Sequence, residues 1–508
     1  MPEDAAPRRP WLVLAICCMS MLIVSLDNTI LNVALPTIQR DLHTSVSGLQ
    51  WTVDGYTLVL ASLLMLAGST ADRVGRRRVF QAGLVVFSAA SLLCSLAPSL
   101  GWLVAARMLQ AVGGSMLNPV AMSIISNTFT EPRQRARAIG VWGGVVGLSM
   151  AAGPIVGGAL VESAGWRSIF WINVPIGIAA LFLARRFIPE SRAPRARRAD
   201  PVGQALVVVL LVALTYAIIE SPARGWTSPL VIGGAIAALG ALLGLLWYEP
   251  RRTDPLIDLR FFRSVPFAGA TVNAVAAFAA LGGFLFVSSL YLQNVRRLDP
   301  LHAGLFMLPM AVMALLLAPL SGRMVASRGP RLPLLLAGTA LCASAVLQAL
   351  TYSAHLPTAV LVVAYLLFGT GFGLVNAPIT NTAVSGMPRA QAGVAAAVAS
   401  TSRQVGQSLG VAVIGALMAG QAYADPAALT GAGRTAWWII AGCGAAVAVI
   451  GTLASGRWAR ATARRAAERL ASEETPEAPG TPEAPGTPEA PDTAAAAGSR
   501  GTEETVKT

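Results

Sequence analysis

The amino-acid sequence predicts an all-α membrane protein that crosses the bilayer many times. Hydrophobic residues make up 55% of the 508 positions and charged residues only 12%, whereas a soluble domain usually carries about 25% charged residues. Charge-free stretches recur along the chain, for example from Trp11 to Leu26 and from Val79 to Ala106. About 20 apolar residues form a helix long enough to cross the ~30 Å apolar core of a bilayer.

Fourteen such spans are expected. The first follows a short basic segment, but it is too long for the apolar part of a signal peptide, so we interpret it as an uncleaved helix. The spans cover residues 11–35, 49–69, 79–97, 101–126, 138–160, 168–187, 201–220, 229–248, 266–292, 302–321, 332–353, 357–383, 394–420 and 433–456. An even number of spans puts both ends of the chain on the same side of the membrane.

The distribution of basic residues indicates which side this is. With the N-terminus in the cytoplasm, 30 of the 38 lysine and arginine residues fall in cytoplasmic segments and 6 in outer loops. Cytoplasmic loops of membrane proteins carry such an excess of basic residues. We therefore expect a multi-pass protein of the plasma or inner cell membrane with both termini cytoplasmic.

An internal repeat divides the chain into two parts. The loop after the second span runs from Gly68 to Arg77, and the loop after the tenth runs from Gly322 to Arg331. Both loops are basic and carry two glycines at the same spacing. Spans 1–6 and 9–14 are therefore predicted to be two parallel six-helix bundles, with spans 7 and 8 inserted between them.

The predicted domains follow from this repeat and from a change of composition near the C-terminus. The segment Thr475–Gly480 is repeated there among acidic residues with almost no bulky apolar side chains, and such a segment cannot bury enough apolar surface to fold. The domains are residues 1–190, the N-terminal bundle; 191–265, a linker with two extra helices; 266–456, the C-terminal bundle; and 457–508, a disordered cytoplasmic tail.

Several classes of function are excluded by composition. The formal charge of +13 arises in membrane loops, so no nucleic-acid partner is expected. The only lysine, Lys507, is next to the C-terminus, whereas a Walker A phosphate loop needs a lysine after its glycine-rich turn. The chain therefore has no ATP motor, and no ATPase subunit is expected. The five cysteines lie in apolar stretches without metal-ligand spacing, so neither a metal nor another cofactor is expected, and the chain is not expected to be an enzyme.

Three ionisable residues inside predicted spans are candidates for function: Asp27, Asp54 and Arg107. At ~1.5 Å per helical residue, all three fall in one layer in the outer half of the membrane. Such residues are costly in a bilayer and usually functional. We expect Arg107 to pair with one carboxylate at a time, leaving the other to take a proton or a cation. A static ion pair, with one acid near the headgroups, is the alternative.

Two other charged residues lie in or beside predicted spans. Arg403, near the middle of the span 394–420, is expected either to line a cavity or to bond helix carbonyls. Glu220, at the outer end of the span 201–220, is expected to be solvated.

Six sequence motifs follow one another along residues 11–456. They are Leu26–Pro36, Gly68–Arg78, Arg107–Gly114, Gly140–Gly158, Trp166–Pro175 and Pro255–Phe262. In this order they resemble the motifs of the major facilitator superfamily, specifically its fourteen-helix drug:proton antiporter family. The resemblance implies a major-facilitator fold that exchanges protons for drugs across the membrane.

The resemblance also implies roles for particular residues. Arg107 is tied to proton coupling. The loop motif is expected to latch the inward gate through charge and helix-dipole contacts, and its residues are Gly68, Asp72, Arg73, Gly75 and Arg76. The antiporter motif is expected to bend its helix and allow close packing, and its residues are Gly153, Pro154, Gly157 and Gly158. Two positions depart from the family, because Ala111 and Ser149 stand where glycine is usual.

The stretch from Trp51 to Leu58 is most similar to the branch that exports quaternary ammonium compounds and lipophilic cations. Trp51 and Tyr56 would then contact a cation through their rings. The leading interpretation is proton-coupled export of hydrophobic drugs or antibiotics, including cationic ones, from the cytoplasm. The alternative is dedicated export of one endogenous antibiotic or metabolite. A membrane sensor or enzyme is disfavoured by the lack of a catalytic cluster, and proton-coupled uptake by the antiporter motif.

Overall fold

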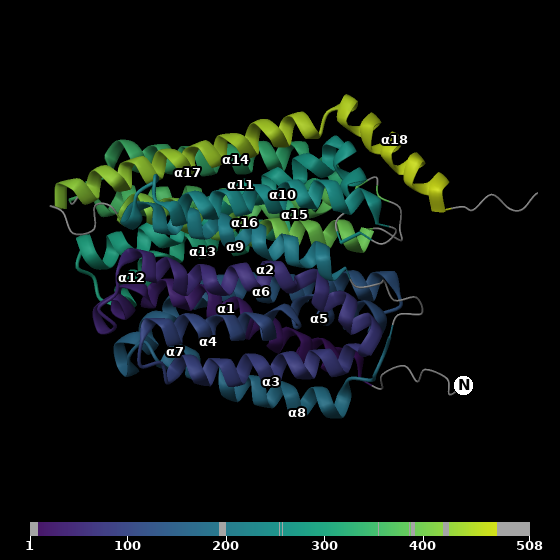
Figure 1. Cartoon of the computed structure of the whole chain (residues 1–508), viewed down its shortest axis with the longest axis horizontal. Helices are drawn as coiled ribbons and strands as arrows, with labels where there is room; N and C mark the ends of the chain where they lie inside the picture. The colour runs from purple at the N-terminus through teal and green to yellow at the C-terminus, as the bar shows by residue number, and fades with distance from the viewer. Residues whose placement is uncertain are drawn as a thin grey trace, which may run out of the picture.

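The computed structural model describes residues 9–192, 200–252, 255–256, 258–353, 355–385, 387, 392–419 and 426–474. The regular secondary structure of these residues is helical, and most of the helices run side by side along one long axis (Figure 1). The helices form two groups, which we call the first half and the second half.

The first half consists of helices α1 to α8. Two of the predicted spans are each broken into two helices. One span contains α4 and α5, and another contains α7 and α8. The helices are α1 (Pro10–Asp41), α2 (Val46–Val74), α3 (Arg76–Ser95), α4 (Leu100–Ser115), α5 (Asn118–Thr128), α6 (Pro132–Ala164), α7 (Ser168–Trp171) and α8 (Asn173–Phe187).

The second half consists of α11 to α17, with α9 and α10 inserted before it and α18 after it. A π-helical turn extends α11, and two 3₁₀ turns lie between α10 and α11. The elements are α9 (Pro201–Arg224), α10 (Pro229–Tyr248), η1 (Glu249–Arg251), η2 (Leu259–Arg263), α11 (Val265–Leu290), η3 (Tyr291–Val295), α12 (Pro300–Phe306), α13 (Leu308–Arg328), α14 (Arg331–Thr351), α15 (Thr358–Val384), α16 (Ala392–Ala419), α17 (Pro426–Ala454) and α18 (Arg457–Glu474).

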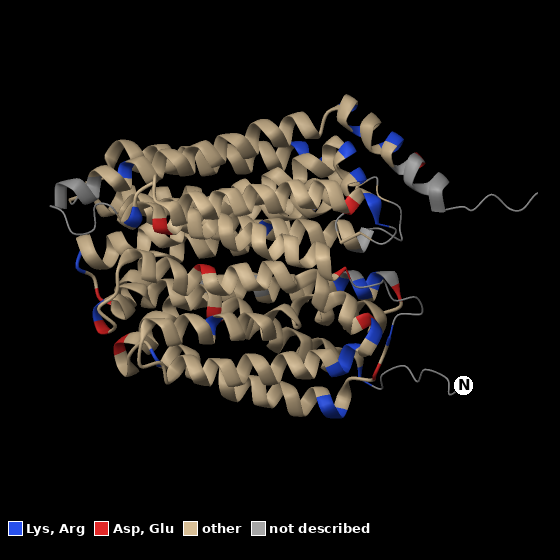
Figure 2. Ribbon diagram, in the orientation of Figure 1, with Lys and Arg blue, Asp and Glu red and all other residues tan. Residues whose placement is uncertain are grey.

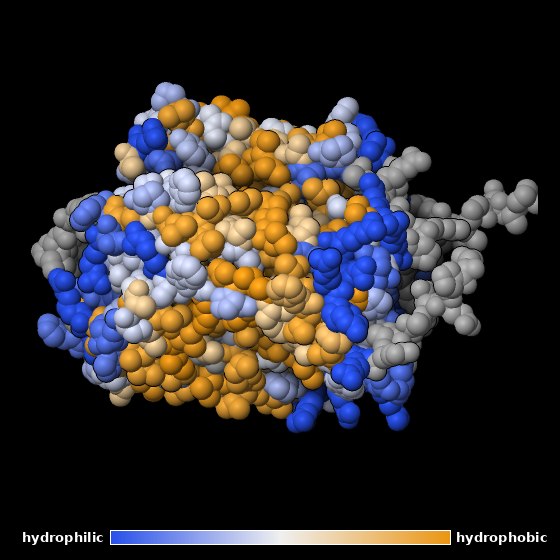
Figure 3. Space-filling view, turned by 90° about the horizontal axis from the view of Figure 1, so that it is seen from below, coloured by the Kyte–Doolittle hydropathy of each residue, from blue (hydrophilic) through white to orange (hydrophobic). Residues whose placement is uncertain are grey.

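Within the described residues, 12 helices are long and apolar enough to cross a membrane, and the two parts of α6 that meet at a 41° bend make a thirteenth candidate. Helix α16 is long enough but is not among them, because a polar run from Ser400 to Ser408 interrupts its apolar sequence. Figure 3 shows apolar side chains forming a belt between hydrophilic ends. The chain is therefore a multi-pass membrane protein.

The broken spans have a local cause. Pro119 follows the break between α4 and α5, and Pro309 follows the break between α12 and α13. Proline has no N–H to donate and is tolerated in the first turn of a helix. A new helix therefore begins at each proline. The helices before and after each break still lie within one predicted span.

The two ends of the bundle differ in charge. Helix α1 begins and α18 ends at the same end of the molecule (Figure 1). Most of the lysine and arginine residues drawn in blue in Figure 2 lie at this end too. We call it the basic end and the opposite end the far end.

The prediction of a disordered tail over residues 457–508 is wrong for the first part of this segment. Residues Arg457–Glu474 form helix α18, because this segment is rich in alanine, arginine and glutamate, which favour helix. Ala459 is buried, and the Thr462 hydroxyl accepts a hydrogen bond of 3.0 Å from the backbone N–H of Val265 at the start of α11. The repeats that motivated the prediction, from residue 475 on, lie outside the described residues.

Helix packing sets the two halves against each other along two seams. Within the halves, α1 packs on α6, α11 on α16, and α14 on α17. Between the halves, α2 packs on α16, while α6 packs on α12 and α13. The inserted helix α9 contacts both α2 and α16, so it covers the first of these seams.

Candidate functional site

A buried ion pair lies in the core of the first half. The guanidinium of Arg107 on α4 donates from Nη1 to Oδ2 of Asp27 on α1, and the two side chains are 0% and 1% exposed. A buried ion pair is stable only when its remaining donors and acceptors also have partners. The stability of this pair therefore depends on the polar groups around it.

Three polar side chains complete this site. Gln110, one turn after Arg107, accepts from Arg107 Nη1 at 2.6 Å and donates from its amide to Asp27 Oδ1 at 2.9 Å. Asn173 at the start of α8 donates to the same oxygen at 2.8 Å. Both amides also donate to the hydroxyl of Ser91 on α3. Asp27 thus accepts hydrogen bonds from three donors, so both of its carboxyl oxygens have partners.

Arg107 is also held by an aromatic ring. Its guanidinium carbon lies 4.2 Å from the centre of the Tyr56 ring, a cation–π geometry. Tyr56 is 0% exposed, and its hydroxyl has no hydrogen-bond partner. The structure therefore places Tyr56 beneath Arg107 in the core, whereas the sequence suggested a ring that contacts substrate.

Asp54 lies in α2, and no hydrogen bond or ion pair joins it to Asp27 or Arg107 in the described part of the chain. It is 0% exposed, although the sequence left open a position near the headgroups. The hydroxyl of Ser408 on α16 interacts with its carboxyl group, but neither carboxyl oxygen accepts a hydrogen bond of normal geometry. Arg107 is thus paired with Asp27, and Asp54 faces the seam between the halves without a basic partner.

The antiporter motif packs against two different helices. A Cβ built on Gly153 would overlap the Thr29 hydroxyl of α1, and one on Gly157 would lie 3.0–3.2 Å from atoms of Ile30. On the other side, a Cβ on Gly158 would meet the Pro300 carbonyl of α12 at 2.6 Å.

Pro154 completes the contact with α12. Its carbonyl oxygen lies so close to Gly304 that a Cβ there would overlap it. The motif therefore brings α6 close to both α1 and the second half, as its small residues permit.

The loop motif contains a local ion pair and a glycine with a required conformation. Arg76 donates to Asp72 at 2.8 Å, one turn apart. Gly75 has φ +125°, and a Cβ there would meet the Glu190 carboxylate at 2.6 Å. Glu190 accepts from the backbone N–H of Arg77 at 3.0 Å.

The sequence reasoning gave no role to Glu190. Its side chain also lies 3.9 Å and 3.7 Å from Arg77 and Arg78. The available signal was one acid just before an arginine-rich segment. Of the other predicted loop residues, Gly68 faces Pro119, which a Cβ on the glycine would meet at 3.8 Å, and Arg73 is exposed.

Trp51 connects α2 to the inserted helix α9. Its indole N–H donates to Glu220 at 3.1 Å, and Glu220 also pairs with Arg224 at 3.0 Å. The expectation that Glu220 is solvated is wrong, because its side chain is only 17% exposed and bonded to both partners. A second contact joins the same helices, where Gln204 donates to the carbonyl of Ser62.

Arg403 on α16 bonds hydroxyl groups and not helix carbonyls. It donates to Thr380 on α15 and to Ser400 at 3.4 Å, and its guanidinium carbon lies 6.0 Å from the Phe278 ring. These partners all belong to the second half. No hydrogen bond or ion pair joins Arg403 to Asp27 or Arg107 in the described part of the chain.

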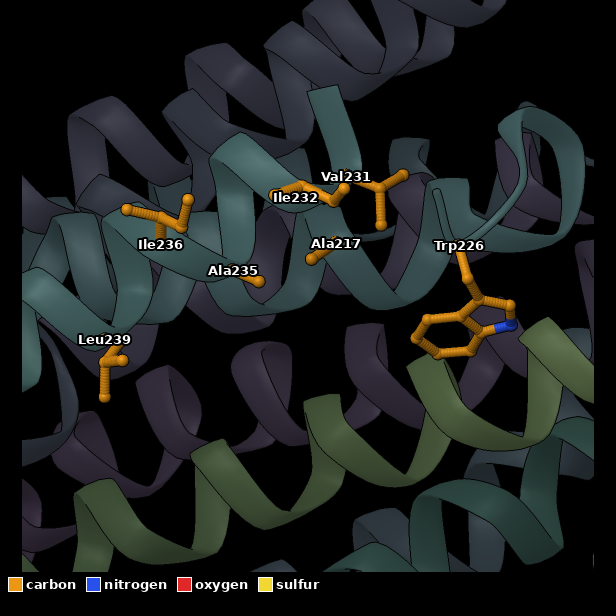
Figure 4. Close-up of a pocket in the computed structure, with 7 residues that line it drawn as sticks. All are labelled: Ala217, Trp226, Val231, Ile232, Ala235, Ile236 and Leu239. Carbon is orange, nitrogen blue, oxygen red and sulfur yellow. The ribbon is translucent and has the colours of Figure 1, made fainter. Parts of the chain in front are cut away.

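Two apolar grooves lie on the surface. One, of about 410 Å³, lies between the basic-end parts of α1 and α6 and includes Trp11, Cys18, Met19 and Leu148. The other, of about 260 Å³, lies between α9 and α10 beside Trp226 (Figure 4). Side chains of α10 such as Ile236 are exposed there, as expected for a helix that faces lipid.

No metal centre is found in the part of the chain that the structure describes, since no three His, Cys, Asp or Glu side chains are grouped to hold an ion. The five cysteines are free thiols.

Comparison with known proteins identifies the family. The model of the Major Facilitator Superfamily matches residues 17–215 and 199–411. Multidrug resistance protein Stp of Mycobacterium tuberculosis is 38% identical, over 79% of this chain and 74% of Stp. The tetracenomycin C resistance and export protein of Streptomyces glaucescens is 39% identical, over 82% of this chain and 78% of that protein. The multidrug efflux pump LfrA of Mycolicibacterium smegmatis is 35% identical, over 81% of each chain.

Solved structures share the fold. A crystal structure of the peptide transporter POT with sulfate matches 92% of this chain and 96% of its own, with a TM-score of 0.64 at 16% identity. The xylose transporter XylE from E. coli matches 87% of this chain and 95% of its own, with a TM-score of 0.60 at 14% identity. The chain belongs to the major facilitator superfamily.

Proposed function

We propose that this protein is a proton-coupled antiporter that exports hydrophobic drugs or antibiotics, including cationic ones, from the cytoplasm. The printed functions of Stp, LfrA and the tetracenomycin C protein support drug export. The observation that carries proton coupling is that one half contains two buried carboxyl groups, Asp27 with a basic partner and Asp54 without one. No cofactor, ATPase subunit or enzymatic step takes part.

The proposed topology has fourteen spans with both termini in the cytoplasm. Helix α16 and the bent α6 bring the 12 candidate spans to fourteen. Each runs the length of the bundle, in the direction opposite to the spans before and after it in the sequence. The basic end is the cytoplasmic end, because cytoplasmic loops collect arginine. The proposed domains are residues 1–190 and 266–456 as two bundles, with 191–265 as the linker that carries α9 and α10.

Proton exchange rests on the difference between the two carboxyl groups. Asp27 is bonded to an arginine and to two side-chain amides. Asp54 has no basic partner, and a buried carboxyl without one costs least in its neutral form. When the halves rock, a buried carboxyl that loses such partners takes up a proton, and one that gains them releases a proton.

The groove between α1 and α6 is the proposed place where hydrophobic substrate first binds. Its volume of about 410 Å³ falls in the usual range for drug-sized ligands, about 300–1,000 Å³. It lies at the cytoplasmic end, where substrate arrives from the cytoplasm or the inner leaflet. A cationic substrate would then move toward Asp54, which supplies the complementary charge.

The loop at the basic end is the proposed inward gate. Asp72 is paired with Arg76 within its own loop, and Glu190 holds the first turn of α3. When the basic end closes, these charges come within reach of the second half and exchange partners. The residues proposed for gating are Gly68, Asp72, Arg73, Gly75 and Arg76.

The test is transport by the purified full chain in proteoliposomes with an imposed pH gradient. We expect uptake of ethidium or a quaternary ammonium dye into inside-out vesicles that are acidic inside, and no uptake without a gradient. Collapse of the gradient with a protonophore is the control. Uptake that is unaffected by the gradient would refute proton coupling, and no uptake of any compound in a panel of cationic and neutral drugs would refute drug export.

A second candidate is dedicated export of one endogenous antibiotic or metabolite by the same mechanism. The observation in its favour is that some relatives are named for single antibiotics, tetracenomycin C and methylenomycin A. A resistance profile of an expressing strain separates the two candidates. Protection against many unrelated compounds supports a multidrug exporter, and protection against one supports a dedicated exporter.

A further inference from the structure

Pro36 interrupts the hydrogen bonding of α1 near the far end. Proline has no N–H, so in an α-helix it leaves the carbonyl four residues earlier without its usual donor. In α1 this is the carbonyl of Asn32, a residue that is only 2% exposed. A buried backbone carbonyl needs a partner from elsewhere.

The partner comes from the second half of the protein. The hydroxyl of Ser289 on α11 donates to the carbonyl oxygen of Asn32. One turn later, Gln293 donates from Nε2 to the carbonyl oxygen of Val33 at 2.8 Å and to the Ser289 hydroxyl at 3.5 Å. Ser289 is 0% and Gln293 7% exposed, so these bonds are shielded from water.

The position of these bonds gives them a role in transport. They join α1 to α11 at the far end, where the close contact of Gly158 with α12 and the bonds of Gln50 to the carbonyls of Val411 and Ala412 also join the halves. Among the described residues, a further bond between the halves, from the Gln407 amide of α16 to Asn28 of α1 at 3.4 Å, lies nearer the middle of both helices. A transporter of this family must separate its halves at the far end to release substrate.

We propose that Ser289 and Gln293 are positioning residues that clamp the far end closed, Ser289 by bonding the Asn32 carbonyl that Pro36 frees on α1 and Gln293 by bonding the neighbouring carbonyl of Val33. The clamp is strong while the seam is dry, because an unmade bond leaves a buried carbonyl without a partner. Once the halves part, water reaches the same carbonyl and replaces the hydroxyl. The proline thus gives the far end a contact that stabilises the closed state. Opening costs little free energy, because water then bonds the Asn32 carbonyl.

The test measures the opening of the far end directly and needs no drug. Spin labels are placed at Arg40 at the end of α1 and at His355 in the second half, both exposed, in a transport-competent background whose native cysteines are replaced by alanine. Distances between the labels are measured by electron–electron double resonance in lipid nanodiscs. The same experiment is then done on Ser289→Ala and Gln293→Leu.

We expect both substitutions to increase the population with long distances. Loss of one hydrogen bond of ordinary net strength corresponds to a shift of about five- to tenfold in the ratio of open to closed molecules. The matched control is Ser344→Ala, which removes a buried hydroxyl-to-carbonyl bond between α14 and α15 inside the second half. Its distance distribution should remain that of the parent.

A double-mutant cycle tests the part played by proline. In Pro36→Ala the new N–H bonds the Asn32 carbonyl inside α1, so Ser289→Ala should have a smaller effect in that background. Unchanged distances in both Ser289→Ala and Gln293→Leu, with folded protein by size-exclusion chromatography, would overturn the proposal. An equal shift in Ser344→Ala, or equal effects of Ser289→Ala with and without Pro36, would also overturn it. Because the readout is a distance, a failure of drug export leaves it valid.

Discussion

Asp27 of α1 and Arg107 of α4 are bonded to each other with both side chains shielded from solvent. Gln110 and Asn173 bond the remaining carboxylate oxygen, whereas Nε and Nη2 of Arg107 have no hydrogen-bond partner. Removing one partner of such a pair costs about 3–5 kcal/mol, because the other charge stays buried. In the proposed mechanism, a proton or another cation takes the place of Arg107 when the two side chains separate.

The first prediction concerns the way in which Arg107 is held. Arg107→Lys keeps the charge but loses the planar group that stacks on Tyr56 and bonds two acceptors, so we expect transport to fall by at least about tenfold, equivalent to ~1.4 kcal/mol. Tyr56→Phe should leave transport near the parent level, because the hydroxyl has no partner. Dye efflux from cells measures both. An equal loss of transport in Arg107→Lys and Tyr56→Phe would contradict the account, in which Tyr56 acts through the cation–π contact of its ring with Arg107.

Asp54 should determine the charge preference of the protein. We expect Asp54→Asn to reduce resistance to dicationic compounds by about tenfold or more, equivalent to ~1.4 kcal/mol, because a carboxylate in a low-dielectric seam attracts cations strongly. Resistance to neutral compounds should change much less. Minimum inhibitory concentrations for paired cationic and neutral drugs provide the measurement. A uniform loss for all compounds would indicate a role in coupling without selectivity.

Gly158 should be intolerant of even one methyl group. Gly158→Ala forces α6 away from the α12 backbone, and such overpacking costs about 1–3 kcal/mol. Gly140→Ala in the same helix is the matched control, because a Cβ there meets nothing within 4 Å. Thermal unfolding in detergent should show a lower midpoint for Gly158→Ala only. Similar midpoints in the two variants would mean that the seam is looser than described.

Trp51 should act mainly through its bond to Glu220. Trp51→Phe keeps the ring and removes the N–H, so we expect a loss of stability of about 1 kcal/mol, the net value of one hydrogen bond. The double variant with Glu220→Ala should lose no more than Glu220→Ala alone, since both remove one contact. The range of exported compounds should remain the same. A narrowed range in Trp51→Phe would instead favour direct contact of the indole with substrate.

The membrane spans could be predicted from sequence because they depend on local features, namely the length of each apolar stretch and the arginines in the loops beside it. The helix ends were harder to predict. The first predicted span stops at residue 35, but α1 continues through Pro36 to Asp41. One proline removes one hydrogen bond, and here Ser289 supplies a substitute from 257 residues away. Such a long-range partner leaves no signal near Pro36 in the sequence.

The candidate site was predictable in its residues but only partly in its partners. Charged side chains in apolar spans are conspicuous, so Asp27, Asp54 and Arg107 stood out. The carboxylate that Arg107 contacts depends on the rotation of the helices about their axes and on the position of α8, which supplies Asn173. The periodicity of the sequence determines neither the rotation nor the position. Ser91 was missed because serine is common in apolar helices. Tyr56 was placed wrongly because its two possible faces differ only by rotation of α2.

The most direct test of the account is proton movement on addition of drug. Inside-out vesicles that contain the full chain are energised to an acidic interior, and proton efflux is followed with a pH-sensitive dye. Glu131→Gln, an exposed acid at the start of α6, is the control for Asp27→Asn. The account predicts drug-induced proton release in the parent and in Glu131→Gln, and none in Asp27→Asn. Proton release in Asp27→Asn equal to that of the parent, with drug still accumulated against its gradient, would contradict it.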